Sequence, residues 1–246
     1  MEIRWLEQVT ADVPSGNEWF SADEHLILRG MKIPKRRSDW QLGRWAAKQA
    51  VAAYLQLSSK SYDLATIELR PAATGAPDVY VSGGPANISI SLSHRDGTAA
   101  CAVVSAEGVV GCDLELIEPR SDVFITDYFT PEEQEIIAHS EGAQRDRLVT
   151  ILWSAKESAL KALRTGLRVD TRSVCACLAD PCALKSDAHA GDESNEWFPL
   201  RVREAATGQL FAGWWRCLGS LVRTVVSQPA ADPPIPLLQQ RLASTR

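Results

Sequence analysis

Apolar positions recur with two different periods along the chain, and each change of period predicts a change of secondary structure. Residues 40–55 repeat apolar positions at helical spacing and are rich in alanine, so we predict a long helix capped by Ser38 or Asp39. Strict alternation follows at residues 67–70 and 88–92, as in half-buried strands. The first hundred residues therefore predict a helix followed by strands.

Two further apolar segments lie close together in the middle of the chain. Residues 99–104 and 109–116 are separated by a short polar stretch that contains Gly108. Two strands joined by so short a turn usually pair with each other. We therefore predict a β-hairpin at this point.

The second part of the chain repeats the order of helix and strands. Thr130 is predicted to cap a helix, with Pro131 in its first turn and Glu133 completing a capping box. A long helix is expected from about residue 145 to 163, ended by Thr165 and Gly166. Strands are predicted near residues 171–179, 197–203, 208–216 and 219–227.

This repeated order predicts an α+β fold made of two similar α+β halves joined near Glu118. We expect an N-terminal half over residues 1–117, a C-terminal half over residues 118–228, and a Pro-rich extended tail over residues 229–246. Residues 185–196 are polar and small, which predicts an exposed loop.

Composition narrows the class of protein. The chain has 246 residues, 45% of them hydrophobic, and a net charge of -5, which argues against a general nucleic-acid binder. No apolar run is long enough to span a membrane and no signal peptide is apparent, so we expect a cytoplasmic protein. The cysteines Cys175, Cys177 and Cys182 lack the paired spacing of a zinc site, and we expect reduced thiols.

Carboxylates gather in two segments. Asp113 and Glu115 lie two positions apart on a predicted strand, so both point to one side of it. On the predicted helix, Glu157 and Lys161 lie four apart and share one face with Trp153. If strand and helix meet, three carboxylates converge, and oxygen ligands of this kind suit Mg²⁺.

Positive charge and a hydroxyl are available nearby. Ser93 and His94 lie at the end of a predicted strand, and Arg44 and Lys48 share a helix face just after the basic residue Arg37. Together with the carboxylates they are typical of a site for phosphoryl-type transfer. Each feature alone also fits an ordinary solvated surface.

The chain resembles the 4'-phosphopantetheinyl transferase superfamily in two motifs about forty residues apart. These are Gly111-x-Asp113-x-Glu115 and Trp153-Ser-x-Lys156-Glu157-Ser-x-x-Lys161. Gly43-Arg44-x-Ala-Ala-Lys48 and Ile90-Ser-x-Ser93-His94 resemble further blocks of the larger, pseudo-dimeric branch, typified by the surfactin-synthetase activator. The likeness covers roughly residues 36–166, and the two principal motifs are specific as a pair.

The resemblance implies a monomeric enzyme that transfers 4'-phosphopantetheine from coenzyme A to a serine of an apo carrier protein, releasing 3',5'-ADP. It implies coenzyme A in a cleft between the halves, and partners that include neither nucleic acid nor membrane. It further implies the following roles: Mg²⁺ ligands Asp113, Glu115 and Glu157; a catalytic part for Glu157 and Lys161; phosphate contacts from Lys161, Ser93, His94, Arg44, Lys48 and Arg37.

One departure from the family pattern and two other functions remain. Gly75-Ala76-Pro77 lacks the basic residue common at its centre in this branch. The alternatives are a catalytically inactive carrier-binding module and a Mg²⁺-dependent phosphohydrolase. An acidic carrier would need a basic and apolar docking surface, which we expect around residues 116–130.

Overall fold

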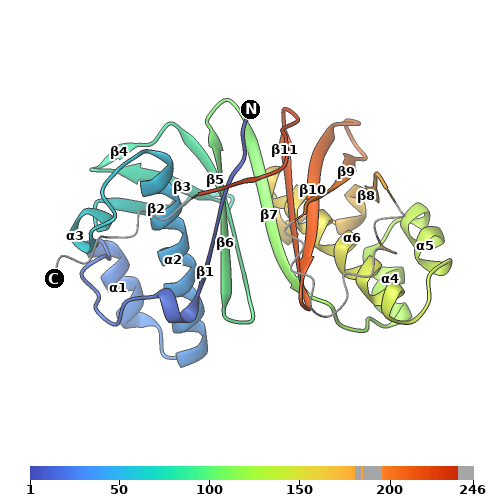
Figure 1. The fold of residues 1–246 in the computed structure, drawn as a ribbon, viewed down its shortest axis with the longest axis horizontal. Coiled ribbons are helices and arrows are strands. Elements are labelled where there is room, and N and C mark those ends of the chain that lie inside the picture. Colours follow the sequence, from blue (N-terminus) through green and yellow to red (C-terminus); the bar gives the residue numbers. More distant parts are fainter. Residues whose placement is uncertain (181–183, 185–195, 238–246) are drawn as a thin grey trace.

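The computed structural model describes residues 1–180, 184 and 196–237, which form two α+β halves side by side (Figure 1). Along the long axis, α2 (Pro34–Tyr54) is followed by a four-stranded sheet, a five-stranded sheet and α6 (Gly142–Ala162). The predicted class, α+β with two similar halves, is confirmed. The predicted loop at 185–196 and Cys182 lie outside the described residues, apart from Glu196.

The first half is built on a sheet with strand order β12-β1-β6-β5 and a smaller sheet with order β2-β3-β4. The strands of the larger sheet are β1 (Arg4–Val9), β5 (Ile88–Arg95), β6 (Thr98–Ser105) and β12 (Ile235–Pro236). The smaller sheet contains β2 (Ile67–Pro71), β3 (Pro77–Val81) and β4 (Gly84–Pro85). Besides α2, the helices of this half are α1 (Ala22–Gly30) and α3 (Ser61–Leu64).

The second half has one antiparallel sheet with strand order β7-β11-β10-β9-β8. Its strands are β7 (Val109–Leu116), β8 (Val174–Leu178), β9 (Phe198–Glu204), β10 (Leu210–Leu218) and β11 (Leu221–Gln228). The helices are α4 (Asp122–Tyr128), α5 (Pro131–Ala138) and α6, which crosses the outer face of this sheet. The four strands predicted after residue 171 are therefore confirmed.

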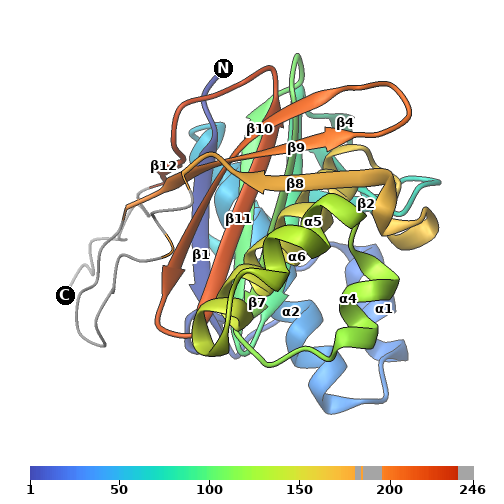
Figure 2. The same ribbon diagram turned by 90° about the vertical axis from the view of Figure 1, so that its right-hand side faces the viewer.

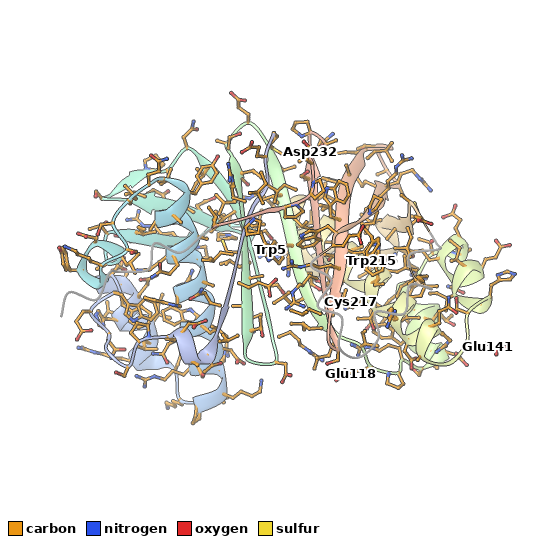
Figure 3. All side chains as sticks on the ribbon, viewed as in Figure 1. Trp5, Glu118, Glu141, Trp215, Cys217 and Asp232 are labelled. Atoms are coloured by element: carbon orange, nitrogen blue, oxygen red, sulfur yellow. The ribbon has the colours of Figure 1, made fainter. Side chains whose placement is uncertain are left out.

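Alternation along β6 explains how the layers pack. Cys101 and Val103 face the core under α2, whereas Ala100, Ala102 and Val104 face the other sheet. Successive strand residues point to opposite faces, so a strand buried on both sides is apolar at every position. The two sheets thus share a core of their own, in which Trp5 is 3% exposed (Figure 3).

The predicted hairpin of residues 99–104 and 109–116 is wrong. The strands exist, but β6 pairs with β1 and β5, whereas β7 pairs with β11. The short turn is closed by a hydrogen bond from the Gly108 amide to the Ser105 carbonyl (3.1 Å). Because both strands have apolar side chains facing the other sheet, they pack face to face across the boundary between the halves instead of forming a ladder.

Helix boundaries follow the capping rules only in part. The capping box before α5 is confirmed: the Thr130 amide donates to Glu133 Oε2 (2.8 Å), and the Glu133 amide donates to the Thr130 hydroxyl (3.3 Å). For α2 the predicted cap at Ser38 or Asp39 is wrong, because the helix begins at Pro34, whose missing amide hydrogen costs nothing in the first turn.

The end of the described chain returns to the first half. β12 runs parallel to β1 (Figure 2), with the Ile235 amide donating to the Ile3 carbonyl (2.9 Å) and the Leu237 amide to the Trp5 carbonyl (2.7 Å). The predicted domain boundaries at residues 117 and 228 stay predictions. Within the described residues, no helix has both the length and the apolar character needed to cross a membrane.

Candidate active site

A close approach between α6 and β7 positions the site. A Cβ atom at Gly111 would lie 1.8 Å from the Ser158 carbonyl oxygen and 2.7 Å from the Ala162 amide nitrogen. Such distances are far below contact, so only glycine allows the helix backbone to rest on the strand. This contact places the Glu157 turn of α6 over the strand that carries Asp113.

Asp113 is the point at which β5, β7 and α6 meet. Its Oδ1 accepts hydrogen bonds from Lys161 Nζ (2.8 Å) and Ser93 Oγ (2.9 Å), and its Oδ2 accepts one from Ser154 Oγ (2.9 Å). Lys161 Nζ also donates to the Cys112 carbonyl (2.9 Å). The carboxylate is 7% exposed and is held by one cation and two hydroxyls.

Glu115 lies on the same side of β7 and is only partly satisfied. Its Oε1 accepts from Trp153 Nε1 (3.3 Å), while its buried Oε2 has no hydrogen-bond partner in the described part of the chain and lies 3.8 Å from both Arg95 and Arg120. Burial, and then the charge of Asp113, raise the pKa of Glu115 above its ordinary value.

Glu157 has the most perturbed carboxylate of the three. Its Oε1 is buried without a hydrogen-bond partner among the described residues. Burial is the largest cause that raises its pKa to about 7; Asp113 and Glu115 add to the shift, and Lys161 opposes it. The dependence on both carboxylates shows that Glu157 shares their electric field.

Two neighbouring bases have shifted pKa values of opposite sign. Burial is the largest single cause and would lower the pKa of Lys161, but the charge and hydrogen bond of Asp113, together with Cys112 and Glu157, outweigh it, so the pKa lies above the ordinary value and the ammonium stays charged. Loss of hydration lowers the pKa of His94, a larger effect than the attraction of Asp39. At neutral pH the positive charge beside Asp113 is therefore that of Lys161 and not that of His94.

The three carboxylates match the ligand chemistry of Mg²⁺, although their side chains are not gathered as a metal centre. Within the described ranges, no group of three or more His, Cys, Asp or Glu side chains is close enough together to hold a metal ion. Two observations still fit a divalent cation: Glu115 and Glu157 each have an unpartnered buried oxygen, and negative charge raises the pKa of Glu157. A hard cation with oxygen ligands would give the buried oxygens a partner and would offset the negative charge around Glu157.

A pocket of about 640 Å³ opens beside these residues, between the two halves. Ser93, His94 and Lys161 line its inner part, next to Asp113. Its walls come from five segments of the fold, namely the start of α2 (Asp39, Trp40, Gly43, Arg44), the end of β2 with the turn to β3 (Arg70, Pro71, Thr74–Pro77), β5 (Ile88–His94), the turn into β7 (Ala106, Gly108–Val110) and the end of α6 with the residues after it (Lys161, Ala162, Arg164, Gly166). A pocket of this volume accommodates an elongated small molecule.

The predicted phosphate-binding residues fall into different positions. Arg44 lines the pocket, stacked 5.1 Å over Trp40 and with its Nε 3.8 Å from Glu24. Lys48 is fully buried and its Nζ lies 2.5 Å from Glu24, so its position does not fit the predicted contact with phosphate. Arg37 is exposed on the first turns of α2 and is not part of the pocket wall.

Sequence reasoning missed several residues around the site. Ser154 stands inside the second motif, where no role was predicted for it, and its hydroxyl donates a hydrogen bond to Asp113. Arg95 and Arg120 come from different halves and flank Glu115. Arg95 directly follows His94, so its position next to the motif could have suggested a role. No local sequence feature indicated Arg120, because its contact with Glu115 depends on the path of the chain after β7.

Comparisons with known proteins give a consistent result. Residues 109–202 match the family described as the 4'-phosphopantetheinyl transferase superfamily. The chain is 23% identical over 184 residues to the 4'-phosphopantetheinyl transferase HetI of Nostoc sp., a match that spans 74% of this chain and 75% of that protein. It is 30% identical over 84 residues to a holo-[acyl-carrier-protein] synthase of Streptococcus agalactiae, spanning 34% of this chain and 71% of the synthase.

A shorter match agrees with these two. A putative 4'-phosphopantetheinyl transferase of Synechocystis sp. is 35% identical over 66 residues, which is 26% of this chain and 27% of that protein. The match to the family begins at the first residue of β7 and ends within β9, so it contains Asp113, Glu115, Glu157 and Lys161.

Proposed function

The chain belongs to the 4'-phosphopantetheinyl transferase superfamily and is a 4'-phosphopantetheinyl transferase, and we propose that it loads an apo carrier protein with the phosphopantetheine arm of coenzyme A. The acceptor is a serine hydroxyl of the carrier. Its oxygen bonds to the β-phosphorus of coenzyme A, the bond from that phosphorus to the bridging oxygen breaks, and 3',5'-ADP leaves with the electron pair. The single observation that supports the proposal is the pairing of Lys161, which lines the pocket, with Asp113 (2.8 Å). Glu157 belongs to the same group of charges, since burial and then the charges of Asp113 and Glu115 raise its pKa.

Glu157 is the proposed general base. Its buried Oε1 has no hydrogen-bond partner among the described residues, so this oxygen is available to accept a proton. The serine hydroxyl of the carrier would donate its proton there as its oxygen attacks phosphorus. Replacing Glu157 by Gln would preserve the shape of the side chain and remove the proton acceptor.

Lys161 is proposed to stabilise charge on the phosphate groups. It lines the pocket and is anchored by Asp113 and the Cys112 carbonyl, so its ammonium is oriented before the substrate arrives. Ser93 and His94 stand on the same wall and can contact the pyrophosphate or the 3'-phosphate. Arg44 is the proposed contact to the adenosine phosphates further along the pocket.

Asp113, Glu115 and Glu157 are the proposed Mg²⁺ ligands. Bound there, the ion would neutralise charge that develops on the phosphate oxygens. The binding of Mg²⁺ should be measured directly, by isothermal titration calorimetry with Mg²⁺ alone. Glu115→Gln should weaken that binding even when no coenzyme A is present.

The function is tested by incubating the protein with coenzyme A, Mg²⁺ and a panel of apo carrier proteins, followed by intact-mass measurement. A carrier that gains one phosphopantetheine supports the proposal. Cleavage of coenzyme A without any carrier would show a phosphohydrolase instead. Binding of carriers with no mass gain across the panel, at any Mg²⁺ concentration, would contradict transfer.

A further inference from the structure

The pocket between the halves has an excess of positive charge. The charged side chains that line it are one carboxylate and four cations, namely Asp39, Arg44, Arg70, Lys161 and Arg164. The proposed function uses Lys161 and Arg44. Arg70 is held by Glu68 on its own strand (2.8 Å). Arg164 is therefore the cation of the pocket wall whose part in ligand binding remains to be explained.

Arg164 follows the end of α6 in a backbone conformation that favours glycine. Its φ is 58°, and the next amide, that of Thr165, donates back to the Leu160 carbonyl (3.1 Å). Gln56 has the same conformation at the end of α2, with a φ of 56°. A left-handed residue thus ends both long helices. Glycine would adopt this conformation with less strain than arginine, so the end of the helix does not explain the arginine side chain.

The Arg164 side chain reaches the opposite half of the molecule. Its Nη2 donates to Asp78 Oδ1 on β3, and the two side chains are 43% and 42% exposed. Its Nε and Nη1 have no hydrogen bond to any residue that the structure describes. A guanidinium presents five N–H donors in a planar fork. Arg164 therefore keeps donors for a ligand in the pocket while Asp78 fixes its position.

The turn beside Asp78 has no charged side chain of its own. It lines the pocket with Thr74–Pro77, a threonine, a glycine, an alanine and a proline. Arg168 lies against this turn from the second half: its Nη1 donates to the Ala73 carbonyl (3.2 Å), and a Cβ atom at Gly75 would lie 3.6 Å from its Nη2. The segment after α6 thus brings positive charge to this wall of the pocket.

From the lining of the pocket and these contacts we propose that Arg164 binds the 3'-phosphate of coenzyme A and makes the enzyme select coenzyme A over dephospho-coenzyme A. The inference rests on the proposed function, which supplies coenzyme A as the ligand. The pyrophosphate belongs beside Asp113 and Lys161, where the transfer takes place. The 3'-phosphate is then the group left for a cation about one helical turn further along the chain. It carries about two negative charges near neutral pH and suits the paired donors of a guanidinium.

A structural brace between the halves is the alternative role for Arg164. An ion pair between exposed side chains contributes little to stability, which makes the brace the weaker explanation. The two roles predict different responses to the loss of Asp78. A brace needs both partners, whereas a phosphate site needs only Arg164 and is freed of a repelling carboxylate when Asp78 is neutralised.

Binding of the two nucleotides tests the proposal without relying on catalysis. Coenzyme A and dephospho-coenzyme A are each titrated into the full-length protein at one fixed Mg²⁺ concentration, and calorimetry gives the dissociation constants. Arg164→Gly removes the side chain and keeps a backbone conformation that glycine adopts freely. It should weaken binding of coenzyme A roughly tenfold or more and leave that of dephospho-coenzyme A within about twofold of wild type.

Gln56→Gly is the matched control, because it makes the same backbone change at the end of α2, away from this pocket. It should change the affinity for neither nucleotide. Asp78→Asn should keep or raise the affinity for coenzyme A. Adding Ala76→Lys to Arg164→Gly should restore much of the preference for coenzyme A, since it returns a cation from the opposite wall. Thermal unfolding without ligand checks that each variant is folded.

Three results would overturn the inference. They are unchanged binding of coenzyme A in Arg164→Gly, an equal loss of both nucleotides in that variant, and a loss in Asp78→Asn as large as in Arg164→Gly, which would show a brace. A wild-type protein that selects coenzyme A through Arg164 but loads no carrier would refute the proposed function and leave this inference standing. Normal loading with no preference between the two nucleotides would refute the inference alone.

Discussion

The long helices of the two halves, α2 and α6, carry the same buried ion pair. Lys48 on α2 lies 2.5 Å from Glu24, and Lys156 on α6 lies 2.6 Å from Glu133. Both lysine side chains are fully buried, and both also donate to backbone carbonyls. In each half, the glutamate also completes the capping box of the short helix that precedes the long one, α1 or α5.

A second correspondence links the long helices to their strands. Trp45 precedes Lys48 by three residues, and its Nε1 donates to Gln8 on β1 (2.9 Å). Trp153 precedes Lys156 by three residues, and its Nε1 donates to Glu115 on β7 (3.3 Å). These matched contacts align the halves residue by residue.

The alignment shows where the halves differ. The proposed ligands and the catalytic lysine of the second half are replaced in the first half as follows: Leu6 for Asp113, Gln8 for Glu115, Gln49 for Glu157 and Ala53 for Lys161. The first half keeps the buried pair and the tryptophan but has no charged side chain at these four positions. The first half therefore has the same arrangement of helix and strand without the proposed reactive groups, which lie on β7 and α6 of the second half.

The space between the sheets differs in the same way. Beside β5, serine side chains and a pocket separate the halves. On the side of β10, indole rings fill the corresponding region: Trp5 and Trp197 meet edge to face at 5.4 Å, and Trp214 Nε1 donates to the Ala231 carbonyl (3.0 Å). The larger pocket thus lies on the side of β5, and Ala53, the counterpart of Lys161, lines a smaller pocket of about 480 Å³.

The largest expected effect is on turnover. Glu157→Gln should lower kcat for carrier loading by roughly 10²- to 10⁴-fold, because the proposed proton acceptor is lost. The matched control is Gln49→Glu at the corresponding place on α2, which should leave kcat unchanged. Steady-state mass-spectrometric assays measure both. Equal losses in the two variants would contradict the asymmetry of the halves.

The buried lysines should matter equally to stability. Lys156→Met and Lys48→Met should each lower the free energy of unfolding by about 3–5 kcal/mol, since each strands a buried glutamate. Denaturant unfolding measures the change. A paired replacement, Lys156→Met with Glu133→Leu, should recover much of the loss. If Lys48→Met left the free energy of unfolding unchanged, the ion pair between Lys48 and Glu24 would not be needed for stability.

The smallest expected effect concerns the contact that joins the halves. Glu7 on β1 accepts two hydrogen bonds from Arg223 (both 2.7 Å) and one from Arg216 (2.8 Å). Burial would raise the pKa of Glu7, but the two arginines outweigh it and lower the pKa below 4.5. Its stabilisation is therefore present above that pH and is lost as pH falls through the lowered pKa.

Glu7→Gln should accordingly cost about 1–3 kcal/mol of unfolding free energy at neutral pH. The difference from wild type should shrink as the pH falls below 4.5, the ordinary value for this group. Urea unfolding at a series of pH values measures it. A difference that stays constant down to the acid transition would argue that the ion pair is not its source.

Much of the local structure was predictable, because its causes are local. The capping box at Thr130 and the periodicity of residues 145–163 were recognised from side chains within a few positions of one another. The pairing of β6 could not be predicted, because an all-apolar strand fits equally well in a hairpin or between two sheets. The location of Lys48 was also missed, because a lysine on a helix gives no sign that Glu24 will meet it in the interior.

By itself the sequence determined the two long helices, the strands after residue 171, the class of fold and the residues of the two principal motifs, but not β1, α1 or α4. Tertiary structure decided which strands pair, which of Arg44 and Lys48 reaches the pocket, and how Asp113 and Lys161 come together. The physical reason is one of range. Periodicity and caps act within a few residues, whereas the meeting of β7 and α6 depends on Gly111 and on the packing of residues far apart in the chain.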